Sequence, residues 1–251
     1  MDGPGIIGLS GQVALQRQLE ATANNIANMN TAGFRRDRML FQSFVSPLAV
    51  PGRQVAFVQD RATYVDVGQG AIETTGNPLD AAINGEGFFA IERPGNAGRG
   101  YSRDGRLRIG ADRTLVDSSG RPVLDDGGNR ILMPERSTAL EIRADGSIIA
   151  TIDRLPQQVA RLGLFRANEP RAVRKAGDGL YEIPQAELRP VDPQARSTRI
   201  AQGALEASSV HAVGEITNLT DLQRSYERMQ KIMSDDDSRL RRMIEALGRP
   251  N

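Results

Sequence analysis

The sequence is 251 residues long, which is enough for one or two domains with a hydrophobic core. Its 32 lysines and arginines almost cancel its 31 aspartates and glutamates, so the chain lacks the basic balance expected of a nucleic-acid-binding protein. It contains no cysteine and one histidine, His211, which excludes disulfides, thiolate catalysis and metal sites built from cysteines or several histidines.

Residues 1–34 form the first predicted element, a helical segment with only three charged residues. The spacing predicts a helix from about Gly8 to Met29, stopped before Gly33. Small and apolar residues recur in steps of three and four, as in a helix seam: Leu15, Leu19, Thr22, Ile26 and Met29. A lone helix of this length is marginal in water, so we expect packing to order it.

Residues 35–72 are predicted to form an extended connector. Pro47 and Pro51–Gly52 interrupt the segment, and β-type residues are few. A charged run, Arg35-Arg36-Asp37-Arg38, opens it. We expect these charges to be solvated or to lie at an interface, balanced by nearby acids.

Residues 73–190 predict a β-rich domain with its own core. Short β-type runs alternate with glycine turns of the hairpin type, including Asp104–Gly105 and Asp145–Gly146. The run from Phe88 to Ile91 is typical of a buried strand. Residues 191–205 are then a return connector to the last element.

Residues 206–251 predict a C-terminal coiled-coil helix, from about Asn218 to Leu247, or roughly 45 Å at 1.5 Å per residue. Its outer positions are charged, as in a partly solvated coiled coil. The three aspartates at 235–237 could loosen it locally. If Asp236 fills one core position, the seam alternates steps of three and four throughout: Leu219, Leu222, Tyr226, Met229, Met233, Leu240, Met243 and Leu247.

The predicted fold class is α+β, with terminal helices that form a coiled-coil-like rod domain and a central, mainly antiparallel β domain. Outside its seam the N-terminal helix still presents Leu9 and Val13 with almost no charge nearby. Two interpretations remain open for these stripes. The helices could form an ordinary antiparallel pair within one chain, or neighbouring subunits could bury the remaining apolar residues and so build rings or helical tubes.

Three stretches resemble known motifs. Residues 23–36 read Ala-Asn-Asn-Ile-Ala-Asn-Met-Asn-Thr-Ala-Gly-Phe-Arg-Arg, and residues 203–210 read Gly-Ala-Leu-Glu-Ala-Ser-Ser-Val. Residues 73–89 form the third stretch, which continues through Tyr-Ser-Arg-Asp-Gly at 101–105. Together they are similar to the motifs of the flagellar axial protein family of rod and hook subunits.

The resemblance implies a structural subunit of the bacterial flagellar basal-body rod, the shaft that transmits torque from rotor to hook, and not an enzyme. It implies no cofactor, no nucleic acid and no small-molecule substrate. The expected partners are copies of the chain, other rod proteins, the flagellar export apparatus and the rotor base. Length and the opening Ser10-Gly11-Gln12 are most similar to the proximal rod subunits, with the distal rod subunits as the alternative.

The same resemblance implies a location in the rod region within the periplasm. The N-terminus shows no pattern of a cleaved secretory signal, which agrees with export by the flagellum's own apparatus. The sequence has no apolar run of about 18 residues, so we expect no membrane insertion.

The expected assembly interface combines both seams with the asparagines of the first motif. An asparagine amide can donate and accept across a helix interface and so fix its register. The candidate residues are Leu15, Leu19, Asn24, Asn25, Ile26, Asn28, Asn30, Leu219, Leu222, Tyr226, Met229, Met233 and Leu240.

Three alternatives belong to other functional classes. Residues 85–90 match the outline of a dinucleotide-binding loop, but a strand and a turn follow where such a site needs a helix. Glu73, Asp80 and Glu86 could serve a peptidoglycan-directed hydrolase, although the nearby phenylalanines look like core residues and not like a sugar cleft. The last alternative is a discrete adaptor that binds one partner through its coiled coil.

Overall fold

The computed structural model describes most of the chain, namely residues 3–47, 54–96, 98–135, 137–192 and 197–247. The chain divides into two compact units. We call them the helical unit (Met1–Ala27, Asp37–Tyr64 and His211–Asn251) and the β unit (Asn28–Arg36 and Val65–Val210). The α+β fold class is confirmed, because the terminal helices pack together and the central sheets are antiparallel.

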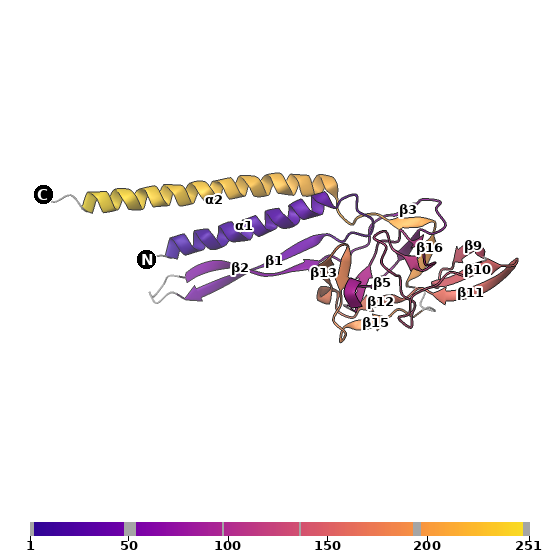
Figure 1. Ribbon diagram of the computed structural model, residues 1–251. Helices are drawn as coiled ribbons and strands as arrows, with labels where there is room; N and C mark the ends of the chain where they lie inside the picture. Colours follow the sequence, from indigo (N-terminus) through magenta and orange to yellow (C-terminus); the bar gives the residue numbers. More distant parts are fainter. Residues whose placement is uncertain (1–2, 48–53, 97, 136, 193–196, 248–251) are drawn as a thin grey trace. The chain divides into compact units, whose positions relative to one another are not determined.

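In the helical unit, α1 (Gly3–Ala27) and α2 (Ala212–Leu247) lie side by side (Figure 1). The 36 residues of α2 span about 54 Å. α2 starts before Asn218, the predicted first residue, and α1 ends before Met29, the predicted last one. None of the helices in the described ranges is long and apolar enough to cross a membrane.

α2 is continuous through its three aspartates, so the expected loosening at 235–237 is not found. Asp237 forms an ion pair with Arg241, one turn later in the helix, with 3.0 Å between Asp237 Oδ2 and Arg241 Nη2. Such a pair supports a helix by about 0.2–0.5 kcal/mol, which offsets part of the low helix propensity of aspartate.

The helical unit also contains β1 (Asp37–Pro47) and β2 (Gln54–Val65), which form a two-stranded sheet. They lie in the segment expected to be an extended connector. The pairing of the two strands is not predicted by the local sequence. Pro47 falls at the end of β1, where a missing N–H costs little, so it ends the strand without preventing the sheet.

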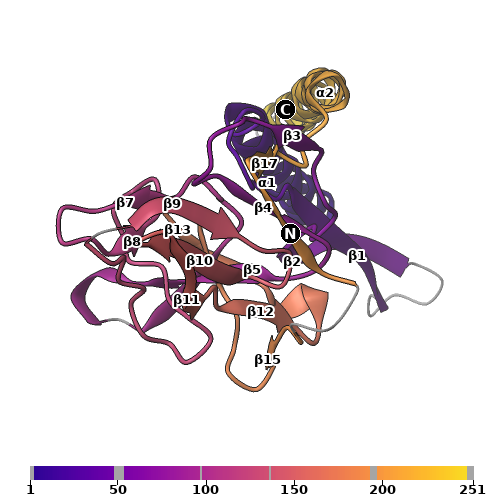
Figure 2. The same ribbon diagram turned by 90° about the vertical axis from the view of Figure 1, so that its right-hand side faces the viewer.

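The β unit is built from short strands in several sheets (Figure 2). Its largest sheet has six strands in the order β13-β14-β6-β5-β12-β15, and β9, β10 and β11 form a three-stranded sheet. Three further two-stranded sheets are formed by the pairs β16–β4, β17–β3 and β7–β8. The strands are β3 (Ile72–Thr74), β4 (Ala81–Asn84), β5 (Phe88–Glu92), β6 (Arg99–Ser102), β7 (Arg108–Ile109), β8 (Leu115–Val116), β9 (Ser137–Ile142), β10 (Ser147–Ile152), β11 (Leu155–Arg161), β12 (Leu164–Ala167), β13 (Arg174–Gly177), β14 (Leu180–Glu182), β15 (Leu188–Pro190), β16 (Arg199–Gln202) and β17 (Ala204–Glu206).

Strand β5 is the centre of the β unit, as its apolar run predicts. Alternate side chains point to opposite faces of a strand. Phe89 and Ile91 therefore enter one hydrophobic cluster, whereas Phe88 and Ala90 enter another. Both faces of the six-stranded sheet are covered, and residues 85–90 lead into this strand and not into the helix that a dinucleotide site requires.

Candidate assembly surfaces and a buried charge cluster

The predicted seam of α2 faces α1 within the same chain. Leu222 is buried, and the other described seam positions up to residue 236 are half-buried: Leu219, Tyr226, Met229, Met233 and Asp236. Asp236 therefore occupies the core position that the periodicity assigned to it. The side chain of Leu240 lies outside the described residues.

The two helices run in opposite directions with a defined register. Gln12 Nε2 donates to the hydroxyl of Tyr226 at 3.1 Å, and Asn218 Nδ2 donates to Thr22 Oγ1 at 3.3 Å. At Gly11 a Cβ atom would lie only 3.1 Å from Met229 Cε, so a glycine lets the methionine approach the helix backbone. The seam is thus an antiparallel pair within one chain, the first of the two interpretations that the sequence left open.

On α1, the predicted seam positions face inward except for the last one. Leu15, Leu19 and Ile26 are half-buried as expected, and Thr22 is buried. Met29 lies beyond the end of the helix and is exposed, because α1 stops at Ala27.

The four asparagines of the first motif have different environments. Asn25 is buried in the helical unit, where its Nδ2 donates to the Asp37 carbonyl at 3.0 Å and its Oδ1 accepts from the Asp37 N–H at 2.8 Å. Asn24 is exposed and donates to Asp37 Oδ2 at 2.9 Å. Asn28 accepts the backbone N–H of Thr31 in a turn of the β unit, and Asn30 is exposed. Asn25 therefore joins α1 to β1 inside the chain.

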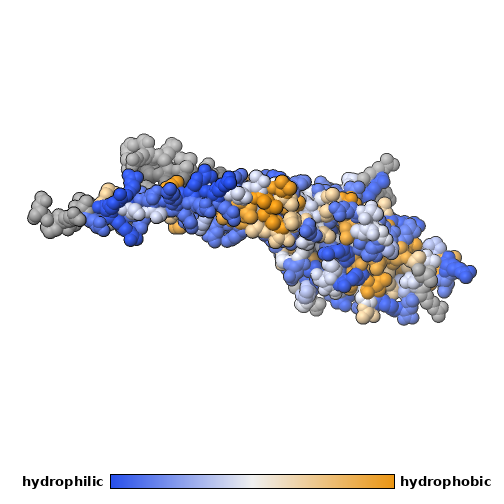
Figure 3. Space-filling view, turned by 90° about the horizontal axis from the view of Figure 1, so that it is seen from above, coloured by the Kyte–Doolittle hydropathy of each residue, from blue (hydrophilic) through white to orange (hydrophobic). Residues whose placement is uncertain are grey.

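Both helices keep exposed apolar side chains after they have paired. On α1 these are Leu9 and Val13, and on α2 they are Val213, Ile216, Ile232 and Met243. Val213 is 80% exposed and Ile232 64%. Figure 3 shows hydrophobic surface over the part of the helix pair near the start of α2 and mostly hydrophilic surface toward its end.

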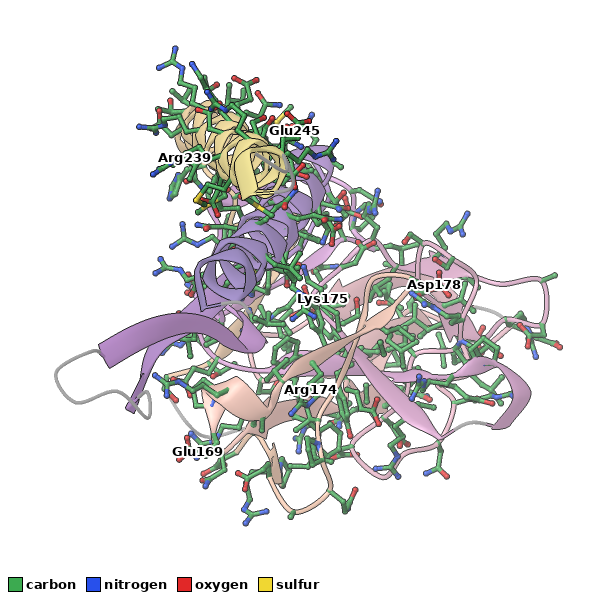
Figure 4. All side chains as sticks on the ribbon, turned by 90° about the vertical axis from the view of Figure 1, so that its left-hand side faces the viewer. Glu169, Arg174, Lys175, Asp178, Arg239 and Glu245 are labelled. Atoms are coloured by element: carbon green, nitrogen blue, oxygen red, sulfur yellow. The ribbon has the colours of Figure 1, made fainter. Side chains whose placement is uncertain are left out.

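α2 extends further than the described part of α1. Because Gly8 lies against Met233 and α1 begins at Gly3, the antiparallel register leaves the turns after Ser238 without an α1 residue beside them. Arg239 and Glu245 project outward from these turns (Figure 4). Met243 is exposed there although it continues the periodicity of the seam.

Within the β unit, Glu206 is the centre of a buried charge cluster. Its Oε1 lies 2.8 Å from Arg35 Nη1 and its Oε2 lies 2.9 Å from Arg103 Nη1. The N–H of Gly70 also donates to Oε1 at 2.8 Å. Arg35 and Glu206 are each 1% exposed, and Arg103 is 3% exposed. Each of the three motifs found in the sequence supplies one member of this charge cluster.

Two guanidinium groups share one carboxylate, so the charge cluster has a net positive charge. Burial and, to a lesser extent, repulsion from Arg35 lower the pKa of Arg103 to about 10, although Glu206 opposes both effects. A folded-state pKa below that of the unfolded chain means that the charged form costs stability, and the cost is relieved only as the pH rises through about 10. Among the described residues, Arg35 Nε and Nη2 and Arg103 Nε also lack a hydrogen-bond partner.

The expectation that Arg35 is solvated or interfacial is wrong. Arg36 is half-buried and pairs with Asp66 at 2.8 Å, and Arg38 is exposed. The sequence contained one usable signal, since each motif carries an ionisable residue and the signs are complementary. Nothing in the local periodicity, however, indicates that residues 35, 103 and 206 meet.

Of the three carboxylates considered for a hydrolase, Asp80 and Glu86 have structural contacts, and Glu73 is exposed. Asp80 accepts hydrogen bonds from Thr75 Oγ1 at 2.7 Å and Asn77 Nδ2 at 3.0 Å, as in a turn. Glu86 lies 3.6 Å from Arg166 at the surface. The part of the chain that is described holds no group of three or more His, Cys, Asp or Glu side chains able to bind a metal ion.

Comparison with known proteins finds family models that match three stretches of the chain. The family model described as flagella basal body rod protein matches residues 7–35. The flagellar hook protein FlgE/F/G D1 domain matches residues 82–150, and the flagellar basal body rod FlgEFG protein C-terminal model matches residues 201–246.

Curated relatives match over nearly the full length. The flagellar basal-body rod protein FlgF of Caulobacter vibrioides is 37% identical over 255 residues, which cover 100% of both chains. FlgF of Mesorhizobium japonicum is 35% identical over 96% of each chain. The flagellar basal-body rod protein FlgG of Bacillus subtilis is 28% identical over 94% of this chain and 96% of its own.

The chain therefore belongs to the flagellar basal-body rod protein family, and it is a structural protein and not an enzyme. Within the family it is a FlgF-like subunit of the proximal rod. Its location in the basal-body rod and its assembly with rod proteins follow from this membership.

Proposed function

We propose that this subunit builds the rod through its helical unit, whose exposed apolar side chains are buried by neighbouring subunits. The observation that carries the proposal is the apolar surface left over after α1 and α2 have paired. Leu9 and Val13 lie on a helix with very few charges, and Val213 and Ile216 lie on the first turns of α2. Single exposed apolar residues are ordinary on a protein surface, so the proposal takes its support from their presence on both helices of a chain that belongs to the rod protein family.

The proposed mechanism is mechanical. Helices from several subunits form an inner bundle around an export channel, and the β unit contacts neighbours outside it. Contacts between unlike surfaces generate a helical tube, whose rigidity comes from many packed helix pairs. The tube transmits torque from the rotor toward the hook.

The candidate residues contribute to assembly in different ways. Leu15, Leu19, Leu222, Tyr226, Met229 and Met233 stabilise the helix pair, which then presents its outer residues to neighbours. Asn30 is exposed, and we propose that its amide contacts neighbouring subunits, whereas the amide of Asn24 binds Asp37 within the chain. Asn25 contributes indirectly by holding β1 on α1.

The proposed partners are copies of the chain, other rod proteins, the flagellar export apparatus and the rotor base. We propose the periplasm as the compartment and the flagellar export apparatus as the route, without cleavage of a signal. These assignments are supported by the family membership.

The test is an image of isolated basal bodies at a resolution that distinguishes side chains. We expect this chain in the proximal part of the rod, with α1 and α2 toward the central channel and Val13 and Val213 against neighbouring helices. A chain found as a discrete oligomer outside the rod would contradict the proposal and would favour the adaptor alternative.

A further inference from the structure

The buried charge cluster of the β unit lies where the chain enters and leaves that unit. The chain passes between the two units after Ala27, Arg36, Tyr64 and Val210. The β-unit segments next to these passages are residues 28–36, 65–70 and 204–210. Arg35 belongs to the first of them and Glu206 to the last.

The first and last segments are hydrogen-bonded to each other. The N–H of Gly33 donates to the carbonyl of Glu206 at 2.8 Å, and the N–H of Ser209 donates to the carbonyl of Phe34 at 2.9 Å. The N–H of Arg36 donates to Ser209 Oγ at 3.0 Å. Three backbone N–H groups therefore join residues 33–36 of the first segment to residues 206–209 of the last segment.

The middle segment is bound to both of the others. Asp66 receives the Arg36 side chain at 2.8 Å and donates its N–H to the Arg36 carbonyl at 2.9 Å. Gly70 donates its N–H to the Glu206 carboxylate. The carboxylate of Glu206 thus contacts the middle segment and, through Arg35, the first segment, while Arg103 ties it to the body of the β unit.

The packing around these bonds has no spare room. A Cβ atom at Gly33 would lie 2.3 Å from the backbone carbon of Arg103, and one at Gly70 would lie 2.0 Å from the carbonyl oxygen of Ala207. Glycine is required at both positions because the backbones touch.

We propose that Glu206 is a positioning residue that clamps these three segments to the β unit, so that the passages of the chain act as one connection. The proposal rests on the proposed function, because a clamp matters only when load passes between the units. Without the carboxylate, each of the three segments can move independently of the other two. With it, a force on the helical unit reaches the β unit through all the passages together.

The charge balance makes an asymmetric prediction. Removing the charge of Glu206 leaves two buried guanidinium groups of like sign with no counter-charge, whereas removing Arg35 leaves the balanced pair of Arg103 and Glu206. Glu206→Gln is therefore expected to open the clamp fully. Arg35→Met is expected to release the first segment and to remove the bond from Arg35 to the carbonyl of Gly68, but to leave the bond from Gly70 to Glu206 in place.

Hydrogen exchange on the purified full-length chain tests this directly. In Glu206→Gln, we expect the amides of Gly33, Gly70 and Ser209 to exchange about tenfold faster or more, while Leu115 and Val123 in the core keep their wild-type protection. A role in overall stability alone would raise exchange at all five amides together, and that result would overturn the proposal. Unchanged exchange at Gly33 and Ser209 would overturn it as well.

Arg35→Met decides the matter if Glu206→Gln does not fold. We expect faster exchange at Gly33 and Ser209 and unchanged protection at Gly70, and equal effects at all three would contradict the clamp. Arg106→Met is the matched control, since it removes an exposed pair with Asp104 and should alter none of these amides. Because exchange is measured on the free chain, a failure here leaves the rod proposal standing, and a failure of rod assembly leaves the clamp testable.

A second measurement, swimming speed at increasing viscosity, tests whether the clamp matters when torque passes through the rod. Cells with Arg35→Met subunits are expected to form basal bodies in wild-type numbers but to lose swimming speed more steeply than wild type as the viscosity of the medium rises. An identical dependence on viscosity would contradict the mechanical role of the clamp.

Discussion

Gly33 shows how one residue links the N-terminal motif to the β unit. It has a positive φ of 68°, and its N–H binds the carbonyl of Glu206. Gly120 is a matched control, because its φ is 82° but no atom lies within 4 Å of a Cβ placed there. A comparison of alanine substitutions at Gly33 and Gly120 therefore separates two effects. Both substitutions strain a left-handed backbone, but only the one at Gly33 places a methyl group against neighbouring backbone atoms.

We expect Gly120→Ala to lower the free energy of unfolding by about 1–2 kcal/mol, the cost of a left-handed alanine. Gly33→Ala should cost about 1–3 kcal/mol more, because the added methyl group collides with the backbone of residue 103. Denaturant unfolding of the two purified variants measures the difference. Equal losses would show that residues 33 and 103 are not in close contact.

Asn25 and Asn24 provide a second comparison at this scale. Asn25→Ala leaves the N–H and the carbonyl of Asp37 without their side-chain partner and should cost about 1–3 kcal/mol for a buried group. Asn24→Ala removes an exposed amide, and its effect on stability should stay within about 0.5 kcal/mol. Thermal unfolding tests the pair, and a larger loss for Asn24→Ala would refute the assignment of Asn25 as the structural member.

At the scale of elements, the helices could be predicted well because their seams repeat every three and four residues. Positions 219, 222, 226, 229 and 233 all face inward, and even Asp236 occupies its assigned place. The start of α2 was missed because Val213 and Ile216 lie outside the seam periodicity and are exposed. The strand Phe88–Ile91 was found because four successive apolar residues fit a strand that is buried on both faces.

The pairing of β1 with β2 and the buried charge cluster could not be predicted in this way. Both depend on contacts between residues far apart in the sequence, such as residues 35 and 206. Local propensity and periodicity carry no information on such contacts. An arginine within a run of charges is normally solvated, so the burial of Arg35 contradicts the ordinary behaviour of its residue type.

The seam of α2 gives a prediction for Met229 and its neighbour Arg228. Because Met229 is half-buried, Met229→Asp removes only part of the roughly 1.5–3 kcal/mol that full burial of a methionine contributes, but it also places a charge against α1, so the helix pair should loosen. The β unit has its own core and should stay folded. Arg228→Gln changes an exposed residue and should alter stability by less than about 1 kcal/mol.

Circular dichroism of the purified variants and complementation of motility measure these effects. We expect Met229→Asp to fail in complementation with its β-sheet signal intact, and Arg228→Gln to complement fully. Normal motility with Met229→Asp would contradict the seam. Loss of the β-sheet signal would mean that α2 belongs to the core of the β unit.

At the scale of the whole molecule, two sets of contacts have different roles. The seams and Asn25 hold each helical unit together, and the charge cluster around Glu206 holds the β-unit segments next to the passages of the chain. The apolar residues that remain outside these contacts are left for neighbouring subunits. The central claim is therefore that Val13 and Val213 are exposed in the free subunit and buried in the rod.

Thiol labelling tests that claim most directly, because the chain has no cysteine of its own. Single-cysteine variants Val13→Cys and Val213→Cys are treated with a maleimide, both as purified subunits and within isolated basal bodies. Ala14→Cys is the control, since its side chain is already buried within the subunit and should resist labelling in both states. The account predicts rapid labelling of positions 13 and 213 in the free subunit and strong protection in basal bodies. Equal labelling rates in the two states would contradict it.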